Sequence, residues 1–121
     1  MHELYATQSL MEHALRRASE AGASRILAAY VVNGALSTIE ADSVRLYWNT
    51  ITPGTPAEGA ALIFRHVPSE LICLSCDYRF SPSGEDDLIC PACGQVRLQV
   101  LAGREFYLEA IDVDTASDGH G

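Results

Sequence analysis

The sequence predicts an α+β fold, with a small mixed three-stranded sheet, two helices, and a second module that carries cysteines. Two observations support this prediction. Helical and strand-like stretches alternate in the first half of the chain, and strand-like sequence returns near its end. Between them, cysteines, prolines and glycines interrupt short apolar pieces. We therefore expect one domain from residues 1–69 and 102–114, and a module of residues 70–101 inserted between two of its strands.

The first helix is expected over residues 4–21. Its apolar residues recur at helical spacing, at Leu4, Met11, Leu15 and Ala18. Gly22 follows and is a typical C-terminal stop for a helix. Residues 25–33 read RILAAYVVN, an apolar and partly β-branched stretch, so they are predicted to form a buried strand. Asn33-Gly34 is a turn sequence that would end this strand.

The second helix is expected to start with Ser37-Thr38-Ile39-Glu40, which matches a capping box. In that motif Ser37 accepts a hydrogen bond from a backbone amide, and Glu40 reaches back to another. The helix behind it is expected to end near residue 51. Its predicted apolar face is Val44, Tyr47, Trp48 and Ile51.

The two remaining strands of the sheet lie on either side of the cysteine segment. After a loop, TPGTPAEG, residues 61–67 alternate as ALIFRHV and are predicted to form a strand. Residues 104–113, REFYLEAIDV, are predicted to form the last one. The tail at residues 115–121 is expected to be disordered.

Charge and hydropathy exclude several classes of function. The net charge is −8, and all eight basic residues are arginines that form no basic patch. Nucleic-acid binding is therefore not expected. No stretch approaches the roughly 20 apolar residues of a membrane span, and charged residues interrupt any signal-peptide core. We expect a cytoplasmic protein that contacts no membrane.

The cysteines form two C-x2-C knuckles, Cys73-Leu74-Ser75-Cys76 and Cys90-Pro91-Ala92-Cys93. Two facing knuckles supply four sulfurs in a tetrahedron, which suits Zn²⁺. In a reducing cytoplasm, metal ligands are more common than disulfides. We therefore predict a zinc-ribbon-like module with rubredoxin-like knuckles. Four cysteines leave no open coordination position, so this zinc is expected to be structural.

Two alternatives remain open for this module. Tetrahedral sulfur also suits iron, which would make the protein a rubredoxin-like electron carrier. The module could also be a zinc-ribbon adaptor that binds other proteins. No phosphate-binding loop, nucleophile or acid–base pair is apparent, so the protein is not expected to be an enzyme.

The chain opens with MHELY, which places His2 beside the amino terminus. Nickel favours nitrogen ligands in a square arrangement. The terminal amine, the neighbouring backbone amides and an imidazole are all nitrogen donors that lie close together in the sequence. Position alone thus makes His2 a candidate nickel ligand, with a solvated terminal residue as the alternative.

These motifs occur in the order MHELYATQSL, NGALSTIE, TPGTPAEGAAL, CLSC…CPACG and RLQVLAGREFYLEAIDV. In these segments and in their order, the chain resembles the HypA family (HybF in some paralogues), the nickel-insertion accessory proteins of [NiFe]-hydrogenase maturation. The resemblance implies a nickel metallochaperone with transient Ni²⁺ and structural Zn²⁺. It implies His2 as a nickel ligand with support from Glu3, and Glu40 close to the nickel. The zinc ligands it implies are Cys73, Cys76, Cys90 and Cys93.

The resemblance also implies partners, namely the HypB GTPase and the hydrogenase large subunit as recipient. Urease is a second client in some members of the family, and the sequence leaves that choice open. Exchange of the inserted module between two chains would give a homodimer. The other histidines, His13, His66 and His120, are not expected to bind metal.

Overall fold

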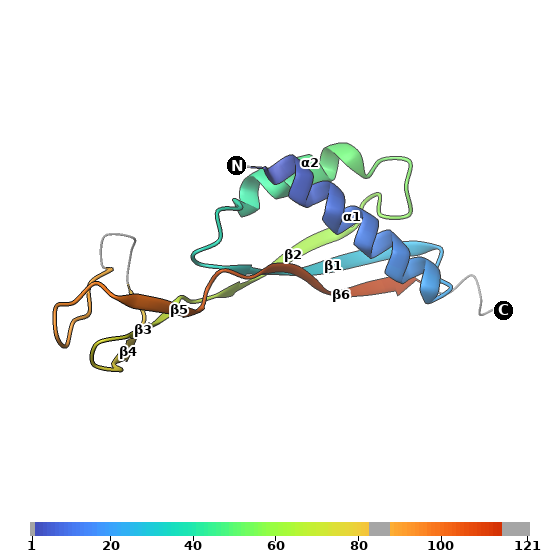
Figure 1. The fold of residues 1–121 in the computed structure, drawn as a ribbon. Helices are drawn as coiled ribbons and strands as arrows, with labels where there is room; N and C mark the ends of the chain where they lie inside the picture. Colours follow the sequence, from blue (N-terminus) through green and yellow to red (C-terminus); the bar gives the residue numbers. More distant parts are fainter. Residues whose placement is uncertain (1, 83–87, 115–121) are drawn as a thin grey trace.

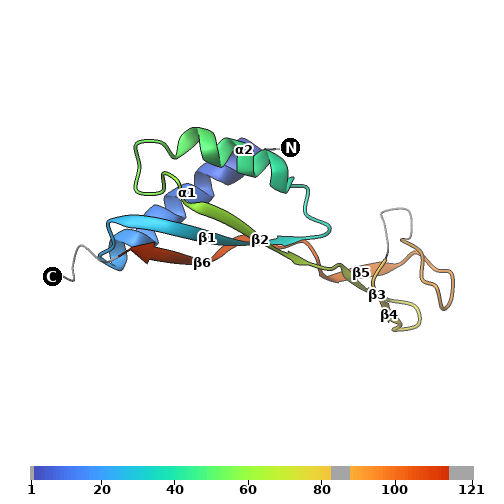
Figure 2. The same cartoon turned by 180° about the vertical axis from the view of Figure 1, so that it is seen from behind.

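The computed structural model describes residues 2–82 and 88–114, so the predicted disordered tail lies outside the described residues. Two helices lie over one face of a sheet, and a second, smaller sheet extends from one end of it (Figure 1 and, from behind, Figure 2). Neither helix in the described ranges has the length and apolar character to span a membrane. In chain order the elements are α1 (Glu3–Glu20), β1 (Arg25–Gly34), α2 (Ala41–Ile51), β2 (Ala61–Val67), β3 (Glu70–Cys73), β4 (Arg79–Phe80), β5 (Leu98–Ala102) and β6 (Phe106–Asp114).

The first sheet has the strand order β2-β1-β6. Strand β2 is parallel to β1, while β6 is antiparallel to it. A parallel neighbour requires a crossover connection, and α2 supplies it between β1 and β2. The predicted mixed three-stranded sheet with two helices is therefore confirmed.

The second sheet is antiparallel, with the order β4-β3-β5. All of its strands come between β2 and β6 in the sequence. The predicted insertion between two strands of one sheet is thus confirmed. Strand β3 begins at Glu70 and β5 ends at Ala102.

The main core lies between the helices and the first sheet. Trp48 of α2 is 1% exposed, and its indole N–H donates to the carbonyl of Ala60 at 3.2 Å. On α1 the predicted apolar face is partly wrong, because Leu4 is 43% exposed. Thr7 is buried instead, and its hydroxyl donates to the backbone carbonyl of Glu3. A threonine can be buried in a helix when its hydroxyl is satisfied in this way.

The end of α1 follows the sequence prediction. Gly22 has a φ of 71°, and its N–H donates to the carbonyl of Ser19 at 3.0 Å. The N–H of Ala23 donates to the carbonyl of Ala18 at 2.9 Å. These two bonds form a Schellman motif, in which glycine takes the left-handed position.

The predicted capping box before α2 is wrong. The N-cap of α2 is Glu40, and no side chain of the helix caps it. The hydroxyl of Ser37 instead accepts a hydrogen bond from the N–H of Ile39 at 3.1 Å, closing a local turn. Ile39 packs against the core. The backbone of Glu40 is extended, with φ −90° and ψ 123°, so the helix starts at Ala41, three residues later than the motif suggests.

The turn after β1 is bonded to the last residue of β2 and to the connection between β5 and β6, the two points where the chain passes to and from the second sheet. The N–H of Ala35 donates to Val67 O at 2.8 Å, and the N–H of Leu36 donates to Gly103 O at 2.6 Å. A Cβ on Gly34 would lie 2.1 Å from Gly103 O, so only glycine allows this approach.

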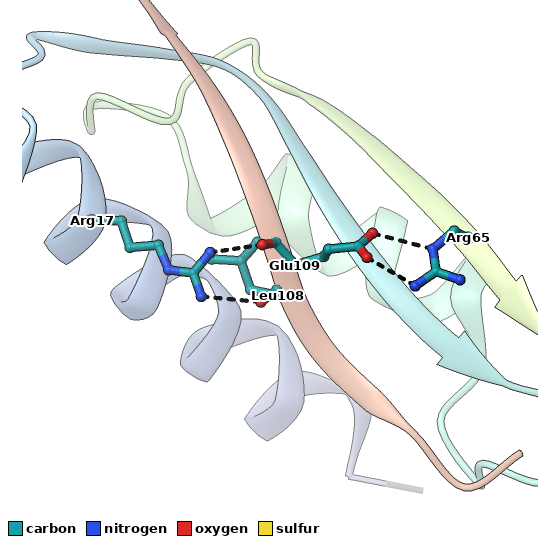
Figure 3. Close-up of polar contacts among 4 residues, drawn as sticks. All are labelled: Arg17, Arg65, Leu108 and Glu109. Carbon is teal, nitrogen blue, oxygen red and sulfur yellow. Dashed lines mark hydrogen bonds and ion pairs between the residues drawn. The ribbon is translucent and has the colours of Figure 1, made fainter. Parts of the chain in front are cut away.

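Arg17, on α1, binds the bulge at which β6 departs from regular pairing with β1 (Figure 3). Its guanidinium donates to the carbonyls of Glu109 at 3.1 Å and Leu108 at 3.3 Å. The carboxylate of Glu109 points the other way and accepts two hydrogen bonds from Arg65 of β2, at 3.2 and 2.8 Å. This network therefore links α1, β6 and β2.

Candidate metal centres

The four cysteines of the inserted module converge on one point. Their sulfur atoms all lie within 4.8 Å of one another. Within residues 2–82 and 88–114, they are the one group of three or more Cys, His, Asp or Glu side chains placed to share a metal ion. Cys73 and Cys90 are buried, whereas Cys76 and Cys93 are exposed. The module thus presents one compact site near its surface.

The geometry of this site fits a tetrahedral metal. The sulfurs of Cys73 and Cys93 are 3.6 Å apart, as are those of Cys76 and Cys90. A Zn–S bond of about 2.3 Å gives a tetrahedron with edges of about 3.8 Å. All four thiols are free, and their separations exceed the roughly 2.05 Å of a disulfide bond.

The two knuckles have the same backbone turn. The N–H of Asp77 donates to Cys73 O at 2.8 Å, and the N–H of Gly94 donates to Cys90 O at 2.8 Å. Both donors have left-handed backbones, with φ values of 64° and 77°. Glycine at position 94 suits this geometry, whereas Asp77 takes it as one of the few other residues that tolerate it. The sequence pattern pointed only to the glycine.

Backbone amides in each knuckle point at a buried sulfur. The N–H of Ser75 lies 3.4 Å from the sulfur of Cys73, and that of Ala92 lies 3.4 Å from the sulfur of Cys90. Burial opposes ionisation of Cys73, but the backbone N–H groups of Ser75 and Cys76, together with the neighbouring thiols, favour the thiolate and lower the pKa of Cys73 to about 7. The thiolate is the form that binds metal, so the knuckle prepares Cys73 as a ligand.

The exposed cysteine of the first knuckle behaves differently. The backbone N–H of Tyr78 favours its thiolate, but burial and the neighbouring sulfurs outweigh that and raise the pKa of Cys76 to about 12. Four thiolates in one place repel one another, so a bound cation is needed before all of them ionise. The donor set therefore fits a soft divalent metal such as zinc.

His2 lies at the start of α1, which is the end of that helix nearer to the second sheet (Figure 1). It is the N-cap of that helix, it is exposed, and its backbone is left-handed, with φ 61° and ψ 23°. Its carbonyl accepts the first helical hydrogen bond, from the N–H of Ala6 at 3.0 Å. A histidine with positive φ is uncommon, and such strain often marks a functional residue.

The structure brings Glu3 and Glu40 together, although they are 37 positions apart in the sequence. Oε2 of Glu3 accepts a hydrogen bond from the backbone N–H of Glu40 at 3.2 Å. In the described part of the chain, the side chains of His2, Glu3 and Glu40 do not form a group placed to share a metal. A metal at this end would therefore need backbone or terminal nitrogen atoms as well.

The other histidines lie elsewhere. His13 is half-buried in a groove beside Phe106 and Tyr107 of β6, and burial, together with nearby arginines, lowers its pKa. His66 is exposed, and its ring stacks on Phe64 with 6.4 Å between the ring centroids. His120 lies outside the described residues. Neither described ring belongs to a group that could share a metal.

Comparisons with known proteins agree with this arrangement. A family model described as "Hydrogenase/urease nickel incorporation, metallochaperone, hypA" matches residues 1–113. The chain is 38% identical over 117 residues to hydrogenase maturation factor HypA of Dehalococcoides mccartyi, covering 97% of this chain and 98% of that protein. It is 37% identical over 115 residues to the HypA of Caldanaerobacter subterraneus subsp. tengcongensis, covering 94% of this chain and all of that one.

Solved structures share the fold. The solution structure of the Ni metallochaperone HypA from Helicobacter pylori matches with a TM-score of 0.67 at 23% identity, over 93% of this chain and 97% of that one. A second solution structure of a HypA protein matches with a TM-score of 0.69 at 23% identity, over 94% of this chain and 97% of that one. Together with the family match from residue 1 to residue 113, these results show that the chain belongs to the HypA family of hydrogenase maturation metallochaperones.

Proposed function

We propose that this protein binds Ni²⁺ at its amino terminus and delivers it to the large subunit of a [NiFe]-hydrogenase. In this proposal the nickel domain is residues 1–69 and 102–114, and the zinc domain is residues 70–101. Both belong to one cytoplasmic protein that works with the HypB GTPase. The observation that carries the proposal is the family match, which spans the amino terminus and the cysteine cluster together.

The start of α1 has features that suit a nitrogen-ligand site. The helical hydrogen-bond ladder begins at the N–H of Ala6, so it does not engage the backbone amides nearer the terminus. Those amides, the terminal amine and the imidazole of His2 are the kinds of donor that Ni²⁺ prefers. His2 is exposed, so a bound ion would be within reach of a partner. Such a site suits transfer better than permanent storage.

Glu3 and Glu40 would support this site in different ways. The carboxylate of Glu3 already receives the N–H of Glu40, so we assign it a supporting role, holding the two helix starts together. Glu40 begins α2 beside Glu3, and in this proposal its side chain approaches the nickel from that helix. His2 remains the ligand on which binding depends in this proposal.

The cysteine module would hold zinc permanently through Cys73, Cys76, Cys90 and Cys93. Four thiolates fill a tetrahedral coordination sphere, which is typical of structural zinc. Family membership favours this reading over an iron-based electron carrier, because such a carrier needs only the two knuckles. It also favours a nickel carrier over a zinc-ribbon adaptor.

The test is a nickel titration of tagless protein with a free amino terminus, combined with elemental analysis. Wild type is expected to hold one zinc per chain and to bind nickel in addition. His2→Ala is expected to lose nickel binding while it keeps its zinc and its circular dichroism spectrum. His13→Ala, on the same helix, is the matched control and should bind nickel as wild type does.

Other outcomes would point to the alternatives. Unchanged nickel affinity in His2→Ala would contradict the amino-terminal site. Zinc without nickel in every variant would favour the adaptor. Iron and visible absorbance after aerobic purification would favour the electron carrier.

A further inference from the structure

Asn33 is a polar residue at a buried position of the central strand, β1. It is 6% exposed and lies two residues after Val31, a member of the core between the helices and the sheet. Alternate residues of a strand share a face, so Asn33 faces the helices. In the described part of the chain, its Oδ1 is the one buried side-chain oxygen or nitrogen without a hydrogen-bond partner. Burying such an acceptor destabilises the fold.

The other end of the carboxamide has a partner. Nδ2 of Asn33 donates to the carbonyl of Ile39, with 3.5 Å between the two atoms. Turning the carboxamide over would place Oδ1 against that carbonyl, and two acceptors repel each other. The orientation observed is therefore the favourable one, and the bond to Ile39 is what this asparagine contributes.

The carbonyl of Ile39 and the N–H of Glu40 belong to the same planar peptide unit. Asn33 binds this peptide through its carbonyl, and Glu3 binds it through its N–H at 3.2 Å. Because the unit is rigid, fixing the direction of its carbonyl also fixes the direction of its N–H. Asn33 therefore helps to determine where the carboxylate of Glu3 lies, and with it the start of α1 beside His2.

We propose that Asn33 is a positioning residue for the amino-terminal nickel site, acting through the Ile39–Glu40 peptide and Glu3. This inference rests on the proposed nickel function. A leucine has nearly the shape of asparagine and carries no polar atom, so it suits this buried position better. It cannot hold the peptide, however. Asparagine at position 33 thus makes the fold less stable than leucine would, but it keeps the proposed nickel site in place. Such a trade-off between stability and function is common at functional sites.

The test compares Asn33→Leu with wild type and with Asn49→Leu, an exposed control on α2. Asn33→Leu is expected to raise Tm by about 3–8 °C and to weaken nickel binding about tenfold. Its zinc content should not change. Asn49→Leu should alter neither Tm nor nickel affinity appreciably. A residue with only a structural role would not raise Tm and lower nickel affinity together.

A second variant keeps the test valid if Asn33→Leu does not fold. Asn33→Ala removes the bond to Ile39 without adding bulk, and it should also weaken nickel binding while zinc stays bound. Nickel affinity equal to wild type in both variants would overturn the inference. So would a loss of stability in Asn33→Leu with nickel affinity retained.

Failure of the underlying nickel function would look different. In that case wild type would bind no nickel, or His2→Ala would bind it as well as wild type does. Amide exchange at Glu40 then decides whether Asn33 positions the peptide. Faster exchange in Asn33→Leu than in wild type would support the positioning role, and unchanged exchange would overturn it.

Discussion

The carboxylate of Glu3 accepts a hydrogen bond from the backbone N–H of Glu40 at 3.2 Å, which fastens the start of α1 to the start of α2. Glu40 is the N-cap of α2, and that helix has no side-chain cap of its own. Glu3 therefore supplies the acceptor and the negative charge that a helix amino terminus favours. One side chain thus joins the starts of the two helices, next to His2.

Replacing Glu3 with alanine should loosen both helix starts. We expect several-fold faster amide exchange at Glu40 and in the first turn of α2, because the acceptor and its charge are lost. Nickel binding should weaken for the same reason. Hydrogen exchange followed by NMR measures the first effect, and titration measures the second. Glu12→Ala, an exposed change on the same helix, should leave both unchanged. Equal exchange rates in Glu3→Ala and wild type would show that Glu3 does not fasten α2.

Removal of metal should unfold the inserted module and leave the first sheet intact. The buried apolar content of this module is small, with Leu71, Cys73 and Cys90 as its buried residues among those described. A core of that size needs a metal or a similar cross-link. A strong chelator or Cys90→Ser should therefore abolish protection from exchange in β3 and β5 while α1 and β1 stay protected.

The control for this prediction is Ser75→Ala. The contact from Ser75 to the sulfur of Cys73 comes from its backbone N–H, so the loss of the hydroxyl should leave metal content unchanged. A module that stays protected after the metal has been removed would contradict a structural role for the metal.

Two glycine substitutions separate a steric clash from backbone strain. Gly34→Ala would place a Cβ 2.1 Å from Gly103 O, although its backbone is not left-handed. Gly34→Ala should lower the free energy of unfolding by about 3 kcal/mol or more, because backbone atoms must move to relieve the clash. In Gly22→Ala the new Cβ has no atom within 4 Å, but alanine must adopt a φ of 71°. This backbone strain should lower the free energy of unfolding by about 1 kcal/mol. Urea denaturation measures both. If the two variants lose the same free energy of unfolding, the backbone around Gly34 and Gly103 relaxes easily and the clash is not costly.

Local patterns in the sequence account for most of the fold. The 61–67 strand, the C-terminal stop at Gly22 and the two knuckles all depend on neighbouring residues, and the structure confirms them. The capping box failed for a non-local reason. Ile39 packs against the core as a partly buried side chain, and the N–H of Glu40 binds the carboxylate of Glu3, 37 positions away. Both contacts compete with the local preference of Ser37 for an N-cap position.

The features that the sequence could not reveal join distant segments. No local signal pairs Glu3 with Glu40, or Gly34 with Gly103, because each contact depends on how the sheet and helices pack. Asp77 could have been found by comparing the knuckles, since it occupies the place of Gly94. Of the three residues at the amino-terminal site, only His2 could be selected by its position in the sequence alone.

Stability near neutral pH should depend slightly on the ion pair between Glu109 and Arg65 (Figure 3). The two hydrogen bonds from Arg65 hold the pKa of Glu109 below its ordinary value, despite an opposing effect of burial. A carboxylate with a lowered pKa stabilises the fold above its unfolded pKa of about 4.3. That contribution is lost as the pH falls through the folded pKa. Glu109→Gln should therefore lower Tm at pH 7, and the difference in Tm from wild type should shrink as the pH falls below the unfolded pKa and vanish once it is below the folded pKa.

The effect should be small, a fall in Tm of roughly 1–3 °C, because the side chains of Arg65 and Glu109 are 57% and 40% exposed. High salt should reduce it further by screening the two charges. Differential scanning calorimetry across pH and salt measures both trends, with the exposed Glu12→Gln as the control. If the difference in Tm between Glu109→Gln and wild type is the same at pH 3.5 and pH 7, the carboxylate acts by packing. In that case the ion pair does not tie β6 to β2.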